Sequence, residues 1–235
     1  DRENIQQKIK NKYFDLVIYG SIRRSNLFFD DVVKYNNKFI FIDGEDDNYI
    51  ETKYSNLGLY FKRELLLKNS KIQPISFAIP KSKILKEIDY YPKNILAPLI
   101  PGRLNTYIYD NEYSYYDMYK KSIFALTYKK AGWDCLRHYE ILMNGCIPLF
   151  LDIENCPKNI ITTIPKDKLI NLLNEFNNIF SFYNPFKIFK KKHLTFQRMF
   201  GLLKFNFKSD NLENFIKENE RVFELKKDLL NFTKE

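Results

Sequence analysis

The stretch FALTYKKAGWDCLRHYEILMNGCIPLF, residues 124–150, carries the clearest fold signal in the sequence. Its apolar ends predict two buried strands, at 123–127 and 147–151, because short apolar runs bounded by turn residues are typical of strands. The segment 136–144 between them predicts a helix, and Gly145 follows as the usual stop residue. A polar loop joins the first strand to the helix. The order strand, loop, helix, strand predicts a unit of a parallel sheet.

The rest of the chain continues this alternation. Further apolar runs predict strands at 14–19, 38–42, 72–79 and 95–100. Helical patterns lie at 3–12, 27–34, 112–121 and 166–180, whereas 56–67 has no clear period. We therefore expect an α/β fold with parallel strands covered on both faces. Four of the nine prolines fall within residues 80–101, which predicts a linker between two lobes, 1–92 and 93–235.

The composition is that of a globular protein with surplus positive charge. The chain has 235 residues, of which 45% are hydrophobic, and a formal net charge of +9. This charge favours an anionic partner such as a nucleotide, a nucleic acid or an acidic membrane surface. A lysine-rich composition caused by an AT-rich genome is the alternative explanation.

Cysteine usage and hydropathy predict a cytoplasmic protein, with peripheral contact to a membrane left open. Cys135, Cys146 and Cys156 lack the spacing of metal ligands, which indicates reduced thiols. No apolar run approaches the roughly 20 residues that span a bilayer, so we expect no transmembrane segment. The chain starts without a methionine, which indicates a piece of a longer polypeptide.

The polar loop after the strand at 123–127 and the start of the next helix gather the residues of a ligand site. Ligands of open α/β sheets lie beyond the carboxyl ends of strands, and helix N-termini favour phosphate. We therefore expect a nucleotide here, contacted by Lys129, Lys130, Trp133, Asp134, Arg137, His138 and Glu140. The alternative is an ordinary ion pair between Arg137 and Glu140, with Asp134 as a helix cap.

The second half of the opening stretch, LRHYEILMNGCIPLF, resembles the nucleotide-sugar loop of GT-B glycosyltransferases, in particular exostosin-like and spore-protein-like members. In that family a glutamate followed by a glycine and a proline binds the nucleotide ribose, and Glu140, Gly145 and Pro148 match this pattern. Many retaining members have a second glutamate eight residues earlier, where this chain has Gly132. The resemblance covers residues 95–165. It implies two Rossmann-like lobes, the first of them reduced, and an inverting enzyme.

The family resemblance also implies the chemistry. The enzyme would move a sugar from a UDP-, GDP- or TDP-sugar to a glycan acceptor, with no metal and no other cofactor. An inverting transferase needs a base for the acceptor hydroxyl. The acidic loop at 43–47 offers Asp43, Glu45 and Asp46, and crowding would raise the pKa of one of these carboxyls. The alternative for this loop is a solvated turn or a cation site.

Two cations complete the predicted site. Lys62 and Arg63 would neutralise the diphosphate leaving group, or else form a surface ion-pair cluster. Other domains of a longer polypeptide are the remaining expected partners.

Two other function classes stay open. A nucleic-acid-binding module fits the net charge, the many aromatic residues and the run KIFKKKH at 187–193. However, the main cationic cluster lies in one loop beside a carboxylate, which suits a small anion better than a long backbone. We therefore expect no nucleic-acid partner. The other class is a transferase-like scaffold without catalysis.

Overall fold

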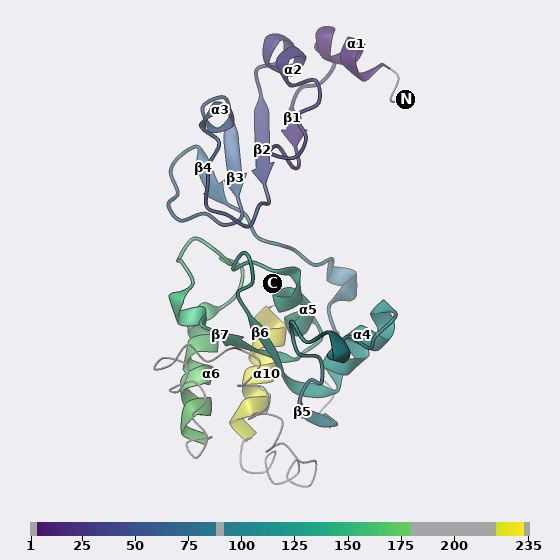
Figure 1. Ribbon diagram of the computed structural model, residues 1–235, viewed down its shortest axis with the longest axis vertical. Helices are drawn as coiled ribbons and strands as arrows, with labels where there is room; N and C mark the ends of the chain where they lie inside the picture. The colour runs from purple at the N-terminus through teal and green to yellow at the C-terminus, as the bar shows by residue number, and fades with distance from the viewer. Residues whose placement is uncertain (1–3, 88–91, 180–219, 233–235) are drawn as a thin grey trace. The chain divides into compact units, whose positions relative to one another are not determined.

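A computed structural model of the chain describes residues 4–87, 92–179 and 220–232 (Figure 1). Its contacts form two compact units. Unit 1 comprises residues 1–77 with the segments 129–134 and 156–164, and unit 2 comprises 78–128, 135–155 and 165–235. Each unit contains one sheet of parallel strands, which confirms the predicted α/β class. The basic run at 187–193 lies outside the described residues.

Unit 1 is built on a four-stranded sheet in the order β1-β2-β3-β4. The strands are β1 (Val17–Tyr19), β2 (Phe39–Asp43), β3 (Leu59–Lys62) and β4 (Ile72–Pro74). The helices are α1 (Ile5–Lys10), α2 (Phe29–Tyr35) and α3 (Thr52–Ser55). The other strands and helices lie within or beside the predicted segments, but neither β3 nor α3 is predicted from the sequence.

The helices of unit 1 pack on one face of its sheet. Along β2 the buried positions alternate, and Phe41 packs against Phe29 of α2 and Tyr54 of α3. The strands lie in the sheet in the same order as in the chain. Because crossover connections between parallel strands are right-handed, α2 and α3 then lie on the same face of the sheet. On the opposite face Ile18 is 55% exposed. The prediction of helices on both faces is therefore wrong for this sheet within unit 1.

Unit 2 contains a three-stranded sheet in the order β5-β6-β7. The strands are β5 (Asn94–Leu96), β6 (Ser122–Tyr128) and β7 (Ile147–Leu151). The α-helices are α4 (Glu112–Lys120), α5 (Leu136–Met143), α6 (Lys166–Ile179) and α10 (Glu220–Phe232). Short 3-10 turns are η1 (Lys81–Lys83), η2 (Leu104–Thr106) and η3 (Ile153–Asn155).

The sheet of unit 2 is covered on both faces, as predicted. All of β7 and all but the last residue of β6 are buried, so successive side chains are enclosed whichever face they are on. Helix α4 packs on β6, α5 packs on β6 and β7, α6 packs on β7, and α10 packs on α5 (Figure 1). Gly145 follows α5 with a φ of 66°, which confirms it as the left-handed stop residue. No helix in the described ranges is long and apolar enough to cross a bilayer.

We expect Cys146 to resist thiol reagents in the folded protein. Its side chain is buried in the core of unit 2, and this burial raises the pKa of the thiol to about 12. The reactive thiolate is therefore almost absent near pH 8. Alkylation of the native protein followed by mass spectrometry should modify the half-buried Cys135 and Cys156 and leave Cys146 intact until denaturant is added. Rapid native labelling of Cys146 would contradict this burial.

Candidate functional site

The predicted site residues are divided between the two units. Unit 1 contains the acidic loop, Lys62, Arg63 and the first part of the polar loop, with Lys129, Lys130, Trp133 and Asp134. Unit 2 contains Arg137, His138 and Glu140. Polar side chains thus form one cluster in each unit.

Asp43 and Lys62 form a buried ion pair in unit 1. They end β2 and β3 and are register partners, with Lys62 Nζ 3.1 Å from Asp43 Oδ1. Their exposed fractions are 1% and 0%. The Tyr60 hydroxyl donates to Asp43 Oδ2 at 2.6 Å, and the backbone N–H of Glu45 donates to Oδ1 at 3.0 Å. The prediction of Asp43 as a base needs correction, because internal partners engage both oxygens of this buried carboxylate.

Arginines neutralise the other carboxylates of the acidic loop. Arg23 donates two hydrogen bonds to Asp47, at 2.6 and 2.8 Å. Arg24 binds Glu45, and its hydrogen bonds lower the pKa of that carboxyl. The hydrogen bonds from Arg23 also lower the pKa of Asp47. Glu45 is therefore not the carboxyl whose pKa crowding raises, because its arginine partner outweighs its acidic neighbours.

Lys62 and Arg63 are bound to oxygen atoms of the protein itself. Arg63 donates to the Gly44 carbonyl through Nε at 2.9 Å, to the Asp46 carboxylate and to the Asp134 carbonyl. Both cations are buried, so neither the predicted diphosphate contact nor the alternative of a surface cluster describes them. Lys62 and Arg63 thus connect the end of β3 to the acidic loop after β2, and Arg63 also connects it to the segment 129–134.

The segment 129–134 docks on the residues that follow β3. The Asp134 N–H donates to Glu64 Oε1 at 2.8 Å, and the Phe77 N–H donates to Asp134 Oδ2 at 3.1 Å. Asp134 is therefore a docking residue. The alternative of a helix cap is wrong, because Cys135 is the N-cap of α5. Glu64 is 4% exposed, and no role was predicted for its carboxylate beyond its place in the charged run with Lys62 and Arg63.

Gly132 lies against two carboxylates, and we expect Gly132→Ala to destabilise the protein. A Cβ there would be 2.6 Å from Glu64 Oε1 and 3.0 Å from Asp46 Oδ1. The displaced Glu64 would leave the buried Asp134 N–H unpaired, a loss of about 1–3 kcal/mol in the free energy of unfolding. Urea denaturation measures this loss. Gly20→Ala is the matched control in unit 1, since a Cβ there meets nothing within 4 Å. Equal free energies of unfolding for Gly132→Ala and Gly20→Ala would contradict the close approach of Gly132 to the two carboxylates.

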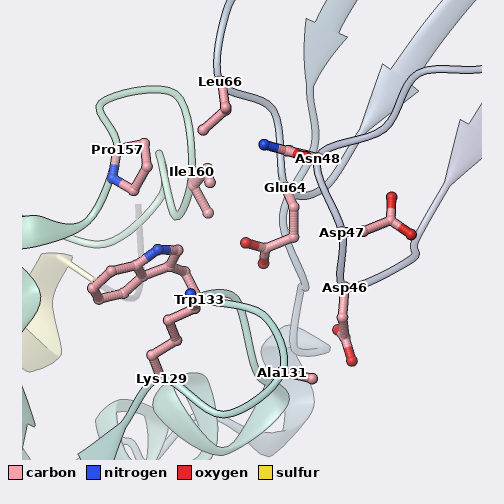
Figure 2. Close-up of a pocket in the computed structure, with 10 residues that line it drawn as sticks. All are labelled: Asp46, Asp47, Asn48, Glu64, Leu66, Lys129, Ala131, Trp133, Pro157 and Ile160. Carbon is pink, nitrogen blue, oxygen red and sulfur yellow. The ribbon is translucent and has the colours of Figure 1, made fainter.

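A cavity of about 270 Å³ lies beside this docked segment in unit 1 (Figure 2). It is lined by acidic, basic, amide, apolar and aromatic side chains from four stretches of the chain, namely Asp46, Asp47, Asn48, Glu64, Leu66, Lys129, Ala131, Trp133, Pro157 and Ile160. Figure 2 shows the Glu64 carboxylate directed towards Trp133. The ammonium of Lys129 lies 5.3 Å from the centre of the Trp133 ring. Lys130 is exposed and does not line this cavity.

In unit 2, the Tyr115 hydroxyl holds the Glu140 carboxylate, and the Tyr116 hydroxyl lies beside it. The Tyr115 hydroxyl donates to Oε2 at 2.9 Å. The Tyr116 hydroxyl lies 3.5 Å from Oε1, but its closer acceptor is Glu112 at 3.1 Å. Burial raises the pKa of Tyr115 to about 12, so its hydroxyl keeps the proton that it donates. Both tyrosines lie on α4, whereas Glu140 lies on α5. The half-buried carboxylate is thereby fixed while other lone pairs stay open to a ligand.

Arg137, in the first turn of α5, has no carboxylate partner among the described residues. Its Nη2 donates to the Tyr107 hydroxyl at 3.1 Å, and its guanidinium lies 5.8 Å from the centre of that ring. Its Nε is buried without a hydrogen-bond partner in the described part of the chain. The alternative of an Arg137–Glu140 ion pair is therefore wrong. A partly desolvated guanidinium at a helix N-terminus favours an anionic ligand.

His138 belongs to the core of unit 2. It is 1% exposed, its Nδ1 lies 2.8 Å from the Thr127 hydroxyl, and its ring lies 4.3 Å from that of Phe150. The predicted ligand contact at His138 needs correction, because its neighbours on β6 and β7 enclose the imidazole.

No group of three or more histidine, cysteine or acidic side chains in the described segments is placed to hold a metal ion. Comparison with protein-family models, curated proteins and solved structures finds no match. The functional argument therefore rests on the contacts of the chain's own residues.

Proposed function

We propose that the protein is a glycosyltransferase that binds a nucleotide diphosphate sugar in unit 2 and transfers the sugar to a glycan hydroxyl. The main support is the pair of charges on α5. Arg137 has no carboxylate partner among the described residues, and Glu140 is held in place by the Tyr115 hydroxyl. Both follow the carboxyl end of β6, where α/β proteins place their ligands.

The two α5 side chains suit different parts of such a donor. The Glu140 carboxylate can accept hydrogen bonds from ribose hydroxyls, as the family pattern implies. The Arg137 guanidinium can bind a phosphate through two parallel hydrogen bonds. Its charge would then stabilise the diphosphate as negative charge develops on the leaving group. Attack by the acceptor hydroxyl on the anomeric carbon would break the bond to the diphosphate and invert the configuration.

The acids predicted as the base all lie in the acidic loop. Among the predicted acids, Asp46 has a carboxylate that is 52% exposed, although Arg63 pairs with it. Asp43 is enclosed and Glu45 is held by Arg24. Asp46 is therefore the predicted base that the contacts leave most accessible.

A donor screen tests the proposal. Purified protein is incubated with UDP-, GDP- and TDP-sugars, and both sugar transfer and donor hydrolysis are measured. We expect turnover of at least one donor, abolished or strongly reduced by Arg137→Ala. Glu154→Gln is the matched control, because Glu154 is an exposed acid of unit 2 outside this cluster. Absence of both reactions with every donor would overturn the proposal.

The net charge of +9 favours a second candidate, a nucleic-acid-binding module. In unit 1, however, carboxylates already engage Arg23, Arg24 and Arg63. Filter binding of single-stranded RNA and DNA at rising salt separates the candidates, because phosphate-backbone affinity falls steeply with salt. Tight, salt-sensitive binding without donor turnover would favour this second function. A third outcome, function that survives Glu140→Ala, would indicate a scaffold.

A further inference from the structure

The cavity of unit 1 contains a buried carboxylate that is only partly used by the protein. Glu64 Oε1 accepts the Asp134 N–H at 2.8 Å, but Oε2 has no hydrogen-bond partner among the described residues. Part of the surface of Oε2 is also exposed, so this oxygen borders open space. Figure 2 shows this carboxylate directed towards the Trp133 side of the cavity. A Glu64 carboxylate fixed through one oxygen thus offers the other to a ligand.

The remaining walls combine an aromatic face with apolar side chains and further oxygen atoms. Trp133 forms one wall, and Leu66, Pro157 and Ile160 lie together on another (Figure 2). Asn48 adds an exposed amide. A ligand that fits these walls has one apolar face and several hydroxyl groups at its edge.

The charges of the cavity are already compensated by the protein. Arg63 neutralises Asp46, and Arg23 neutralises Asp47 at 2.6 Å. The Asp134 N–H stabilises Glu64, and the positive charge of Lys129 lies over Trp133. Arg63 also lies 3.7 Å from Glu64 Oε1, so three cations stand beside three carboxylates and the cavity has no net formal charge. A neutral donor of hydrogen bonds therefore fits the cavity without adding an uncompensated charge.

We infer that the unit 1 cavity binds a single neutral sugar ring, with its apolar face on Trp133 and a hydroxyl donating to Glu64 Oε2. The volume of about 270 Å³ lies just below the range of about 300–1,000 Å³ that is typical for larger ligands, which fits one ring. The inference rests on the contacts of unit 1 alone. Sugar binding in this cavity does not require the donor assignment to be right.

Trp133 is the only tryptophan of the chain, so its fluorescence reports on this cavity directly. The emission is excited where tyrosine does not absorb, and the protein is titrated with glucose, galactose, mannose and N-acetylglucosamine. Glucosamine and glucuronate serve as the cationic and anionic probes. We expect a saturable change with at least one neutral sugar. No saturable change with any neutral sugar, or a response confined to one charged probe, would overturn the inference.

Three variants test whether the sugar binds at Glu64. Glu64→Gln should weaken this binding about tenfold or more, the loss expected for a hydrogen bond to a charged group. Asp15→Asn, an exposed acid of unit 1 outside the cavity, should leave it unchanged. Asn48→Ala lies on an exposed loop and should weaken it roughly threefold without affecting folding, so the test holds even if Glu64→Gln misfolds. Equal affinity in all three variants would contradict the assignment.

The donor screen, run on the same protein, distinguishes failure of this inference from failure of the proposed function. Sugar binding at Trp133 without donor turnover supports the cavity and rejects the transferase. Turnover without any response of Trp133 rejects the cavity assignment alone. Glu140→Ala should leave the Trp133 titration unchanged, because Glu140 does not line this cavity.

Discussion

Replacing Lys62 with methionine is expected to lower the free energy of unfolding by about 3–5 kcal/mol, the usual result of breaking a buried ion pair on one side. Lys62 is 0% exposed and its ammonium lies 3.1 Å from the Asp43 carboxylate. The substitution leaves that carboxylate without its closest cation, with Arg23 at 3.4 Å as the remaining basic partner. Urea denaturation followed through Trp133 fluorescence measures the loss, since Trp133 belongs to unit 1.

The double variant Lys62→Met with Asp43→Asn is the matched control for this stability prediction. The asparagine oxygen can still accept from the Glu45 N–H, and its NH2 group can donate to the Tyr60 hydroxyl oxygen, while the buried negative charge is gone. We therefore expect the double variant to recover a large part of the lost stability. A loss below about 1 kcal/mol in the single variant would match an exposed ion pair and contradict the buried pair.

Replacing Glu140 with alanine is expected to weaken nucleotide-sugar binding by about 10- to 150-fold, which corresponds to about 1.5–3 kcal/mol for hydrogen bonds to a charged group. The carboxylate is fixed by Tyr115 at 2.9 Å and lies on α5 behind the carboxyl end of β6. Its removal takes away the group that the proposal assigns to the ribose. Calorimetric titration of the variant with the best donor of the screen measures the change, and Glu154→Gln should bind as the unaltered protein does.

A nucleotide without the ribose 2′-hydroxyl sharpens the assignment of Glu140. The unaltered protein should bind UDP more tightly than 2′-deoxy-UDP if uridine is its base, and Glu140→Ala should bind the two alike. If the variant keeps the full preference for the 2′-hydroxyl, Glu140 has another role.

The sequence was sufficient where local patterns decide the structure. The strand β7 spans the predicted residues, β6 extends one residue beyond its predicted range at each end, and α5 ends one residue early. Continuous apolar runs indicate strands buried on both faces, and Gly145 ends the helix because it tolerates a positive φ. These signals need no knowledge of distant residues.

Contacts between residues far apart in the sequence determine the features that local sequence patterns do not predict. The strand β3 ends in Lys62 and is followed by Arg63 and Glu64, charges that are usually exposed. They are buried here because Asp43 and the segment 129–134 bring the matching groups. The same docking divides the predicted nucleotide site between two units and makes Glu64 a cavity residue. His138 is enclosed for a similar reason, since its partner Thr127 lies on the preceding strand.

The most direct test of the central claim is a thermal-shift titration of the whole chain with UDP-, GDP- and TDP-sugars, alongside the Glu140→Ala and Glu154→Gln variants. A ligand that binds only the folded state stabilises it by about 2.7 kcal/mol at a hundredfold excess over Kd, which raises Tm. The account predicts that one nucleotide sugar raises the Tm of the unaltered protein and of Glu154→Gln, and that Glu140→Ala loses most of this rise. A Tm that no nucleotide sugar changes, or a rise that Glu140→Ala keeps in full, would contradict a nucleotide-sugar site on α5.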